Sequence, residues 1–137
     1  MARIAIACAA VLVVAGCSTP RDIAGLSGSY VMTIGTDTLH MDGTGLYRRV
    51  MVFNASPAVV LVDSGRWMLA QQGRLVALRD LPQRWPQHGN YDPKQGWHAG
   101  DSTIRQTVSL VVGSTWTGRT ELGVRPEIGW RYLRIQP

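Results

Sequence analysis

The chain has 137 residues and a formal net charge of +5, and only 17% of its residues are charged. This length corresponds to one domain with a modest hydrophobic core. The basic residues are almost all arginines scattered along the chain, whereas proteins that bind nucleic acids usually cluster them. We therefore expect no nucleic-acid partner.

The N-terminal segment has the organisation of a secretion signal. Arg3 supplies a positive charge, and an uncharged apolar run extends from Ile4 to Ala15. A run of about a dozen apolar residues is too short to span a bilayer, and it has the length expected of the apolar part of a signal peptide. Small residues then precede Cys17, so we expect residues 1–16 to be removed as a signal peptide.

The sequence Val14-Ala15-Gly16-Cys17 resembles the lipobox of bacterial lipoprotein precursors. The resemblance implies that the Cys17 thiol receives a diacylglycerol, that the chain is cut before this residue, and that the new amine is acylated. It also implies that Ser18 is the sorting residue and that the protein is held at the periplasmic face of the outer membrane. Since several acyl chains give stable anchoring, the membrane contact would be made by lipid. The alternative is a chance cysteine after an ordinary signal peptide.

The two cysteines give no disulfide in the mature protein. We expect Cys8 to leave with the signal, and the resemblance implies that Cys17 carries the lipid, although the compartment would permit a disulfide. Residues 17–27, which include Pro20 and Gly25, are expected to form a lipidated tether. Residues 28–137 then form a single domain that is stabilised by packing alone.

From Gly28 onward, apolar residues alternate with polar ones, which is the pattern of half-buried strands. Asp42-Gly43-Thr44-Gly45 predicts a hairpin turn, because glycine supplies the positive φ that tight turns need. A strand from Leu46 to Phe53 follows, with Arg48 and Arg49 on opposite faces. In the first two strands the residues expected on one face are Tyr30, Met32, Ile34, Leu39 and Met41.

The pattern continues through most of the remaining chain. Ala58 to Val62 is a continuous apolar run, expected to be a strand that is buried on both faces or that lies deep in a barrel wall. Turns are expected at Asp63-Ser64-Gly65, at Gln71-Gln72-Gly73 and at Gly113-Ser114. Further strands are expected at 66–70, 74–79, 103–112, 116–122 and 128–135, and no helix is expected after the signal.

Eight or nine short strands in about 110 residues indicate an all-β fold. We predict a small antiparallel up-and-down β-barrel of about eight strands, lipocalin-like, after an N-terminal signal helix. Closure of the sheet is expected, because it removes exposed strand edges.

Two hairpins resemble those of lipocalin-like bacterial lipoproteins. The residues from Thr38 to Tyr47, which include Asp42-Gly43-Thr44, resemble an L-x-L-x-x-D-G-T-Y hairpin. The segment Gly65-Arg66-Trp67, with Arg74 to Leu78, resembles a second hairpin of the same proteins. Both occur in the N-terminal barrel of outer-membrane copper-homeostasis lipoproteins. The Cys-x-x-Cys pair of the copper-linked members is absent here, so the resemblance implies a fold and a compartment and no copper role.

The residues from Asp80 to Asp101 interrupt the strand pattern and are expected to form a long loop. A loop of this length in a small domain is usually functional or mobile. Its aromatic rings would either cap one end of the barrel or present a surface to a partner. The basic residues of the loop would suit an anionic partner. The candidate binding residues are Arg84, Trp85, His88, Tyr91, Lys94, Trp97 and His98.

Two other kinds of chemistry have weaker support. Asp63-Ser64-Gly65 resembles the Asp-Ser/Thr-Gly loop of retropepsin-like proteases, in which two aspartates share a proton and activate water. Arg66 stands where that family prefers a small residue. A metal would use His88 and His98 with Asp92, Asp101 or His40, but the ten-residue spacing of the two loop histidines does not match a structural zinc site. We expect no metal and no cofactor.

Three functions remain open. The first is a non-enzymatic binding module that recognises a periplasmic or envelope protein through residues 80–101. The second is a lipocalin-like carrier of a small apolar ligand inside the barrel, lined by Tyr30, Met32, Leu39 and Met41. The third is a hydrolase that uses Asp63.

Overall fold

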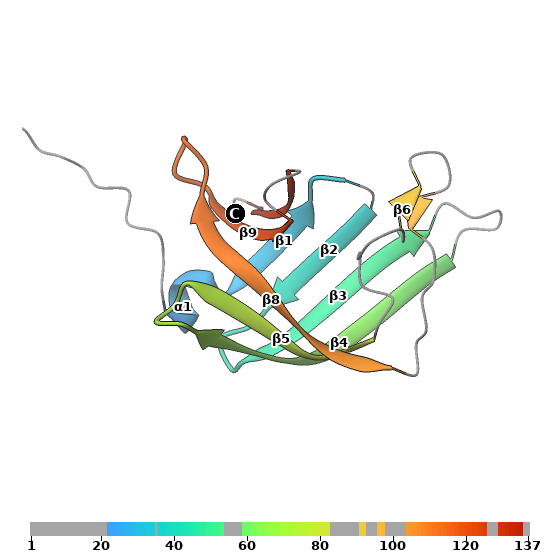
Figure 1. Cartoon of the computed structure of the whole chain (residues 1–137), viewed down its shortest axis with the longest axis horizontal. Coiled ribbons are helices and arrows are strands. Elements are labelled where there is room, and N and C mark those ends of the chain that lie inside the picture. The colour runs from blue at the N-terminus through green and yellow to red at the C-terminus, as the bar shows by residue number, and fades with distance from the viewer. Residues whose placement is uncertain are drawn as a thin grey trace, which may run out of the picture.

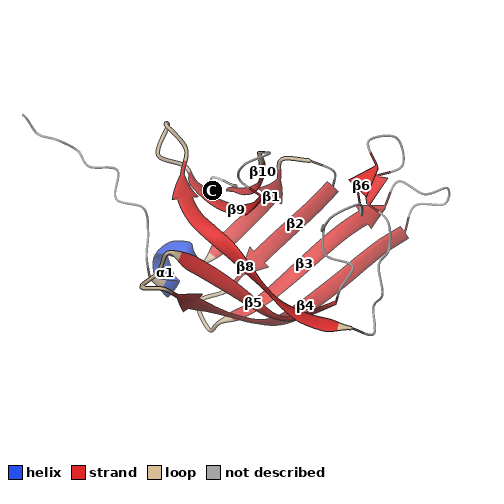
Figure 2. Cartoon of the chain, in the orientation of Figure 1, coloured by secondary structure: helices blue, strands red, loops and turns tan. Residues whose placement is uncertain are grey.

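The computed structural model describes residues 22–34, 36–53, 59–82, 91–92, 96–97, 104–125 and 129–135. These residues form one short helix and ten strands (Figure 2). Their bounds are α1 Ile23–Leu26, β1 Gly28–Met32, β2 Thr36–Met41, β3 Leu46–Phe53, β4 Val59–Ala70, β5 Leu75–Pro82, β6 Tyr91–Asp92, β7 Gly96–Trp97, β8 Arg105–Ser114, β9 Thr120–Arg125 and β10 Trp130–Arg134.

Eight of the strands form a closed antiparallel barrel in the order β1-β10-β9-β8-β5-β4-β3-β2 (Figure 1). Strands that neighbour one another in this sheet follow one another in the chain, and β1 closes the barrel by pairing with β10. The predicted fold class, an up-and-down barrel of about eight strands, is confirmed. The other two strands, β6 and β7, pair only with each other.

The two ends of the barrel differ. At the proximal end, defined by α1, lie the turns at 42–45, 71–74 and 115–119 and the C-terminal end of β10 (Figure 1). At the distal end, β1, β3, β5 and β9 finish, and the β6–β7 hairpin lies against β3. The segment between β5 and β8, which contains the predicted binding residues, therefore leaves and re-enters the barrel at its distal end.

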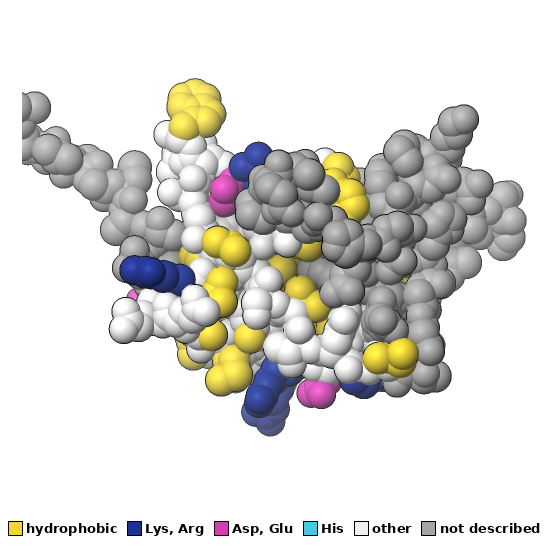
Figure 3. All heavy atoms as spheres, viewed as in Figure 1, with side chains coloured by type: hydrophobic (Ala, Val, Ile, Leu, Met, Phe, Trp, Pro, Cys, Tyr) yellow, Lys and Arg dark blue, Asp and Glu magenta, His cyan; other side chains and the backbone are white. Residues whose placement is uncertain are grey.

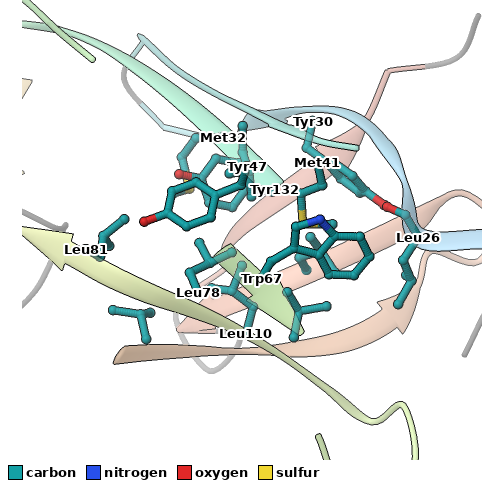
Figure 4. Close-up of a cluster of buried hydrophobic side chains, with 14 residues drawn as sticks. Leu26, Tyr30, Met32, Met41, Tyr47, Trp67, Leu78, Leu81, Leu110 and Tyr132 are labelled. Atoms are coloured by element: carbon teal, nitrogen blue, oxygen red, sulfur yellow. The ribbon is translucent and has the colours of Figure 1, made fainter. Parts of the chain in front are cut away.

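Helix α1 is part of the barrel. The sequence instead predicts that residues 17–27 form a tether and that this stretch contains no helix. Asp22 caps the helix by accepting a hydrogen bond from the amide of Gly25 (2.5 Å). Leu26 is fully buried, and its carbonyl accepts a hydrogen bond from the Tyr30 hydroxyl (2.7 Å; Figure 4). Four residues are too few to show a helical period, which is why the sequence pattern did not reveal α1.

Most inward residues of the barrel pack into one main hydrophobic cluster (Figure 4), and the buried Met51 forms a second, smaller one with Ile34, Leu61 and Trp130. The predicted alternation in β1 and β2 is confirmed, since Tyr30, Met32, Leu39 and Met41 are buried while Ile34 packs against the cluster. The other buried members are Leu26, Tyr47, Trp67, Val76, Leu78, Leu81, Val108, Leu110, Leu122 and Tyr132. Large side chains thus fill the barrel interior along much of its length, as expected for eight strands.

Strand β4 runs without a break from Val59 to Ala70, so the turn predicted at Asp63-Ser64-Gly65 is wrong. The expectation that the apolar run before it is buried on both faces is also wrong, because Val60 and Val62 are 57% and 48% exposed. Strand β3 pairs with β4 across this stretch, so the extended backbone continues and its side chains alternate inward and outward.

The hairpin between β8 and β9 also differs from the prediction. Strand β8 continues through Gly113-Ser114, and the turn lies at residues 115–119. Trp116 therefore lies in the turn and not in a strand. The predicted turn at Gln71-Gln72-Gly73 is confirmed, and Gln71 and Gln72 both have positive φ there.

Candidate functional site

A cluster of charged side chains lies inside the barrel. Nε of Arg49 donates to both carboxylate oxygens of Asp37 (3.1 and 3.0 Å), and Nη2 donates to Oδ2 of Asp37 (2.9 Å). Nη1 of Arg49 lies 3.4 Å from Oδ2 of Asp63. The side chains of all three residues are at most 2% exposed. We call these three residues the interior ion cluster.

The register of three adjacent strands brings these residues together. Arg49 on β3 lies directly opposite Asp63 on β4 and opposite Leu39 on β2. Asp37 lies two residues before Leu39 on the same face of β2, which makes it the diagonal neighbour of Arg49. The alternation in the sequence predicts that Leu39 points inward and that Arg48 and Arg49 lie on opposite faces. The same alternation, extended by two residues, would have identified Asp37.

Tyr132 on β10 is fully buried next to the interior ion cluster. Burial, and secondarily the negative charge of Asp37, hold the pKa of Tyr132 well above its usual value, so its phenol is neutral. Burial on its own lowers the pKa of Arg49, but the charge and hydrogen bonds of Asp37 and the charge of Asp63 outweigh it, and the pKa is raised. The guanidinium is therefore charged in the barrel interior.

This arrangement gives Asp63 an ion-pair role and gives no support to a retropepsin-like hydrolase. In that chemistry two carboxylates share one proton and hold a water molecule. Here Asp37 and Asp63 both contact one guanidinium, and Asp63 is inside a strand rather than on a loop.

Gly65 allows the Tyr47 side chain to cross β4 on the inside of the barrel. The Tyr47 hydroxyl donates to the carbonyl of Arg79 on β5 (2.9 Å), on the far side of β4. A Cβ on Gly65 would lie 2.6 Å from that carbonyl oxygen and 2.9 Å from Cε1 of the tyrosine ring. Gly65, in the second of the two hairpins that are similar to those of lipocalin-like lipoproteins, is therefore required by close packing and not by a turn.

Asp42 organises the first of these two hairpins, which runs from Thr38 to Tyr47. Its Oδ1 accepts hydrogen bonds from the amide of Leu46 (2.9 Å) and from the amide and hydroxyl of Thr44 (2.9 and 2.8 Å). These bonds lower the pKa of Asp42. Its carbonyl accepts from Nε1 of Trp67 (3.0 Å), which joins the two resembling hairpins in one structural unit.

A groove of about 520 Å³ runs along the outer face of β2, β3 and β4. Its polar lining includes His40, Arg48, Ser64, Arg66 and Asp80. His40 shares a hydrogen bond with the hydroxyl of Ser29 (2.9 Å). These side chains alternate with the inward residues of the same strands, so the groove has the composition of a solvated outer wall.

The structure places part of the predicted binding loop. The backbones of Tyr91 and Trp97 are direct partners in the β6–β7 hairpin, at the distal end. The side chains of these two residues lie outside the described part of the structure, as do the residues Arg84, Trp85, His88, Lys94 and His98. Strand β5 extends to Pro82, so the first residues of the predicted loop belong to the barrel.

Most residues of the lipidation and metal predictions lie outside the part of the chain that the structure describes. Cys17 and Ser18 lie outside the described residues, and so do His88, His98 and Asp101. Within the described ranges, no group of three or more histidine, cysteine or acidic side chains is placed to hold a metal ion. Within the same ranges, no helix has the length and apolar character needed to cross a bilayer.

Comparison with known proteins gives no match, whether to a protein-family model, to a curated protein or to a solved structure.

Proposed function

We propose that this chain is a lipoprotein of the bacterial outer membrane, anchored through lipid on Cys17 at the periplasmic face, and that its barrel is a non-enzymatic binding module. The partner is a protein of the periplasm or envelope. It is recognised at the distal end, through the residues from Asp80 to Asp101. The lipobox-like sequence is the evidence for the anchor. The two hairpins that Asp42 and Gly65 stabilise are the evidence for a lipocalin-like barrel.

The observation that carries the proposal is how the predicted binding segment is fixed to the barrel. Leu81 pairs with Gln106, Pro82 pairs with Arg105, and Nη1 of Arg105 donates to the carbonyl of Asp80 (3.2 Å). The two ends of the segment are thus joined to each other at the distal end, and its β6–β7 hairpin lies against β3. A loop positioned by a rigid scaffold is the usual place for recognition.

The packing of the interior favours surface recognition over carriage of an apolar ligand. The four residues proposed as the lining of a ligand cavity, Tyr30, Met32, Leu39 and Met41, are at most 6% exposed and belong to one packed cluster. Further along the barrel, the interior ion cluster is a poor surface for an apolar molecule, because its charged groups are already paired with one another.

Photo-crosslinking in intact cells tests this function. A photoreactive amino acid replaces Tyr91 or Trp97 in the segment, or Arg74 in the proximal turn as the control, in the full-length chain. We expect a discrete protein adduct from the two distal positions and none from Arg74. Adducts that are the same from all three positions, or that are absent from the distal ones, would contradict the proposal. An organic molecule retained in the native mass of the purified protein would favour the carrier.

A further inference from the structure

Trp116 is 96% exposed at the tip of the hairpin between β8 and β9. Figure 3 shows a hydrophobic side chain that projects from this tip, beyond the neighbouring surface. Tryptophan has a large apolar ring and one N–H donor, and it is enriched where proteins meet the interface between membrane and water.

The hairpin holds Trp116 outward in a fixed geometry. The amide of Thr115 donates to the carbonyl of Arg119 (2.8 Å), and the amide of Gly118 donates to the carbonyl of Thr115 (2.9 Å). The hydroxyls of Thr115 and Thr117 share a hydrogen bond (2.8 Å) on either side of Trp116, and Gly118 supplies the positive φ of 80°. The exposure of the ring is therefore built into a closed turn.

Hydrogen bonds connect this hairpin to α1. Nε of Arg119 donates to the carbonyl of Arg134 at the end of β10. The Arg134 guanidinium in turn donates to the carbonyls of Gly25 (2.7 Å) and Ser27 (2.5 Å), in and just after α1. The Trp116 hairpin and the point where the chain enters the barrel thus belong to one end of the molecule (Figure 1).

The length of chain before α1 restricts how far this end can be from a lipid on Cys17. Only five residues, 18–22, separate Cys17 from Ile23. Fully extended, this stretch reaches roughly 20 Å, whereas the twelve residues of β4 alone extend over about 40 Å. This stretch is about half as long as the tether of residues 17–27 expected from the sequence, because α1 takes up the rest. Because barrel strands tilt by about 35–45°, β4 spans roughly 30 Å along the barrel axis, so a barrel standing on its distal end would hold α1 beyond the reach of this stretch.

Other exposed residues at the proximal end suit a lipid surface. Ile23 and Ile135 are 43% and 42% exposed, and the amide of Ile135 is bonded to the carbonyl of Ser29 next to α1. Arg74, exposed in the β4–β5 turn, adds a positive charge, which attracts anionic headgroups. Two described acids lie here: the exposed Asp22, whose carboxylate caps α1, and the partly exposed Asp42, whose carboxylate accepts hydrogen bonds within its own turn.

We propose that the proximal end is a membrane-contacting face, with Trp116 inserted among the headgroups of the membrane that holds the Cys17 lipid. This inference rests on the proposed anchor. It adds an orientation, since the barrel stands on its proximal end and the distal end faces away from the bilayer. The segment from Asp80 to Asp101 is then presented to partners in the periplasm.

Quenching by brominated lipid tests this orientation. The full-length chain is purified from membranes and reconstituted into vesicles of phosphatidylethanolamine and phosphatidylglycerol with brominated acyl chains, which quench tryptophans that touch lipid. We expect strong quenching of the wild-type protein, reduced severalfold in Trp116→Phe. The control Trp130→Phe removes a half-buried tryptophan at the distal end, and quenching is expected to persist in it.

The outcomes separate this inference from the proposed anchor. Equal quenching in the wild type and Trp116→Phe, in chains that float with the vesicles and carry acyl groups on Cys17, would overturn the orientation and leave the anchor standing. If the protein is a particle of twice the chain mass and Trp116 is shielded from lipid in it, the orientation would also be overturned. Trp116 would then contact a second copy of the chain. A chain that lacks acyl groups and does not float would overturn both proposals.

Discussion

Arg49 and Asp63 face each other on the neighbouring strands β3 and β4 inside the barrel, at a distance of 3.4 Å between Nη1 and Oδ2. Asp37 completes the group from β2. A slip of one residue that placed Val50 of β3 opposite Asp63 would leave both carboxylates buried without their cation. We infer that the interior ion cluster fixes the register of these three strands, since buried ion pairs add specificity more readily than net stability.

Replacing Arg49 with methionine should therefore strongly destabilise the fold. The change leaves Asp37 and Asp63 buried without a cation, and breaking such a group costs about 3–5 kcal/mol. The matched control is Arg48→Met on the exposed outer face, where a change within about 0.5 kcal/mol is expected. Urea unfolding of the two variants measures the difference. Equal losses would show that the interior ion cluster has no special role.

A methyl group at Gly65 should also destabilise the protein. The added Cβ must displace either the Arg79 carbonyl, at 2.6 Å, or the Tyr47 ring, at 2.9 Å. We expect a loss of about 1–3 kcal/mol in the free energy of unfolding, as for other overpacked sites. Gly43→Ala is the control, because its nearest contact would be the hydroxyl of Ser27 at 3.8 Å. If the two variants are equally stable, the packing of Tyr47 across Gly65 is not required.

Leu26→Ala should reveal that α1 is part of the core. The side chain is fully buried in the main hydrophobic cluster, and truncating such a leucine costs about 2–5 kcal/mol. Ile23→Ala, at a position 43% exposed in the same helix, should cost much less. Thermal or urea unfolding compares the two variants. If Leu26→Ala lowers the free energy of unfolding no more than Ile23→Ala does, α1 is not part of the core, and the tether predicted from the sequence is the better description.

Stability should decline in alkaline solution because buried tyrosines resist ionisation. Burial raises the pKa of both Tyr30 and Tyr47 from 10.0 to about 12. The unfolded chain therefore loses these protons first, so stability is full below about pH 10 and falls as the pH rises toward 12. Urea midpoints measured across this range, together with tyrosinate absorbance, check the decline.

The matching variant for the alkaline experiment is Tyr47→Phe. It removes one of the shifted groups, so its stability should fall less steeply with pH than that of the wild type, although the lost bond to Arg79 lowers it at neutral pH. A wild-type midpoint that stays constant to pH 12 would contradict the burial of these phenols.

The sequence predicted those parts of the fold that follow a period of two. Alternation through Tyr30, Met32, Leu39 and Met41 identified the inward faces of β1 and β2, and glycine-rich turns marked the hairpins. It failed at Gly65, because a glycine that gives space to a tyrosine ring on another strand looks the same as a turn glycine. It also failed at α1, whose position depends on a hydrogen bond from Arg134 of β10, which is distant in the chain, as well as on Tyr30 of β1.

The candidate site was only partly accessible from the sequence. Asp63 was identified as an unusual aspartate, but its partners Asp37 and Arg49 come from other strands, and only the register brings the three together. The exposure of Trp116 was not predicted either, since the chain was expected to turn at Gly113-Ser114, immediately before the observed turn, and Trp116 was expected to begin the next strand.

Both proposals depend on the lipid at Cys17, and the mass of the mature N-terminus tests it most directly. The full-length protein is expressed in a Gram-negative bacterium, extracted from the membrane fraction and digested, and its N-terminal peptide is measured by mass spectrometry. We predict a chain that begins at Cys17, with a diacylglycerol on the thiol and an acyl group on the amine. A peptide that retains residues 1–16, or one that begins at an unmodified Cys17, would contradict the account.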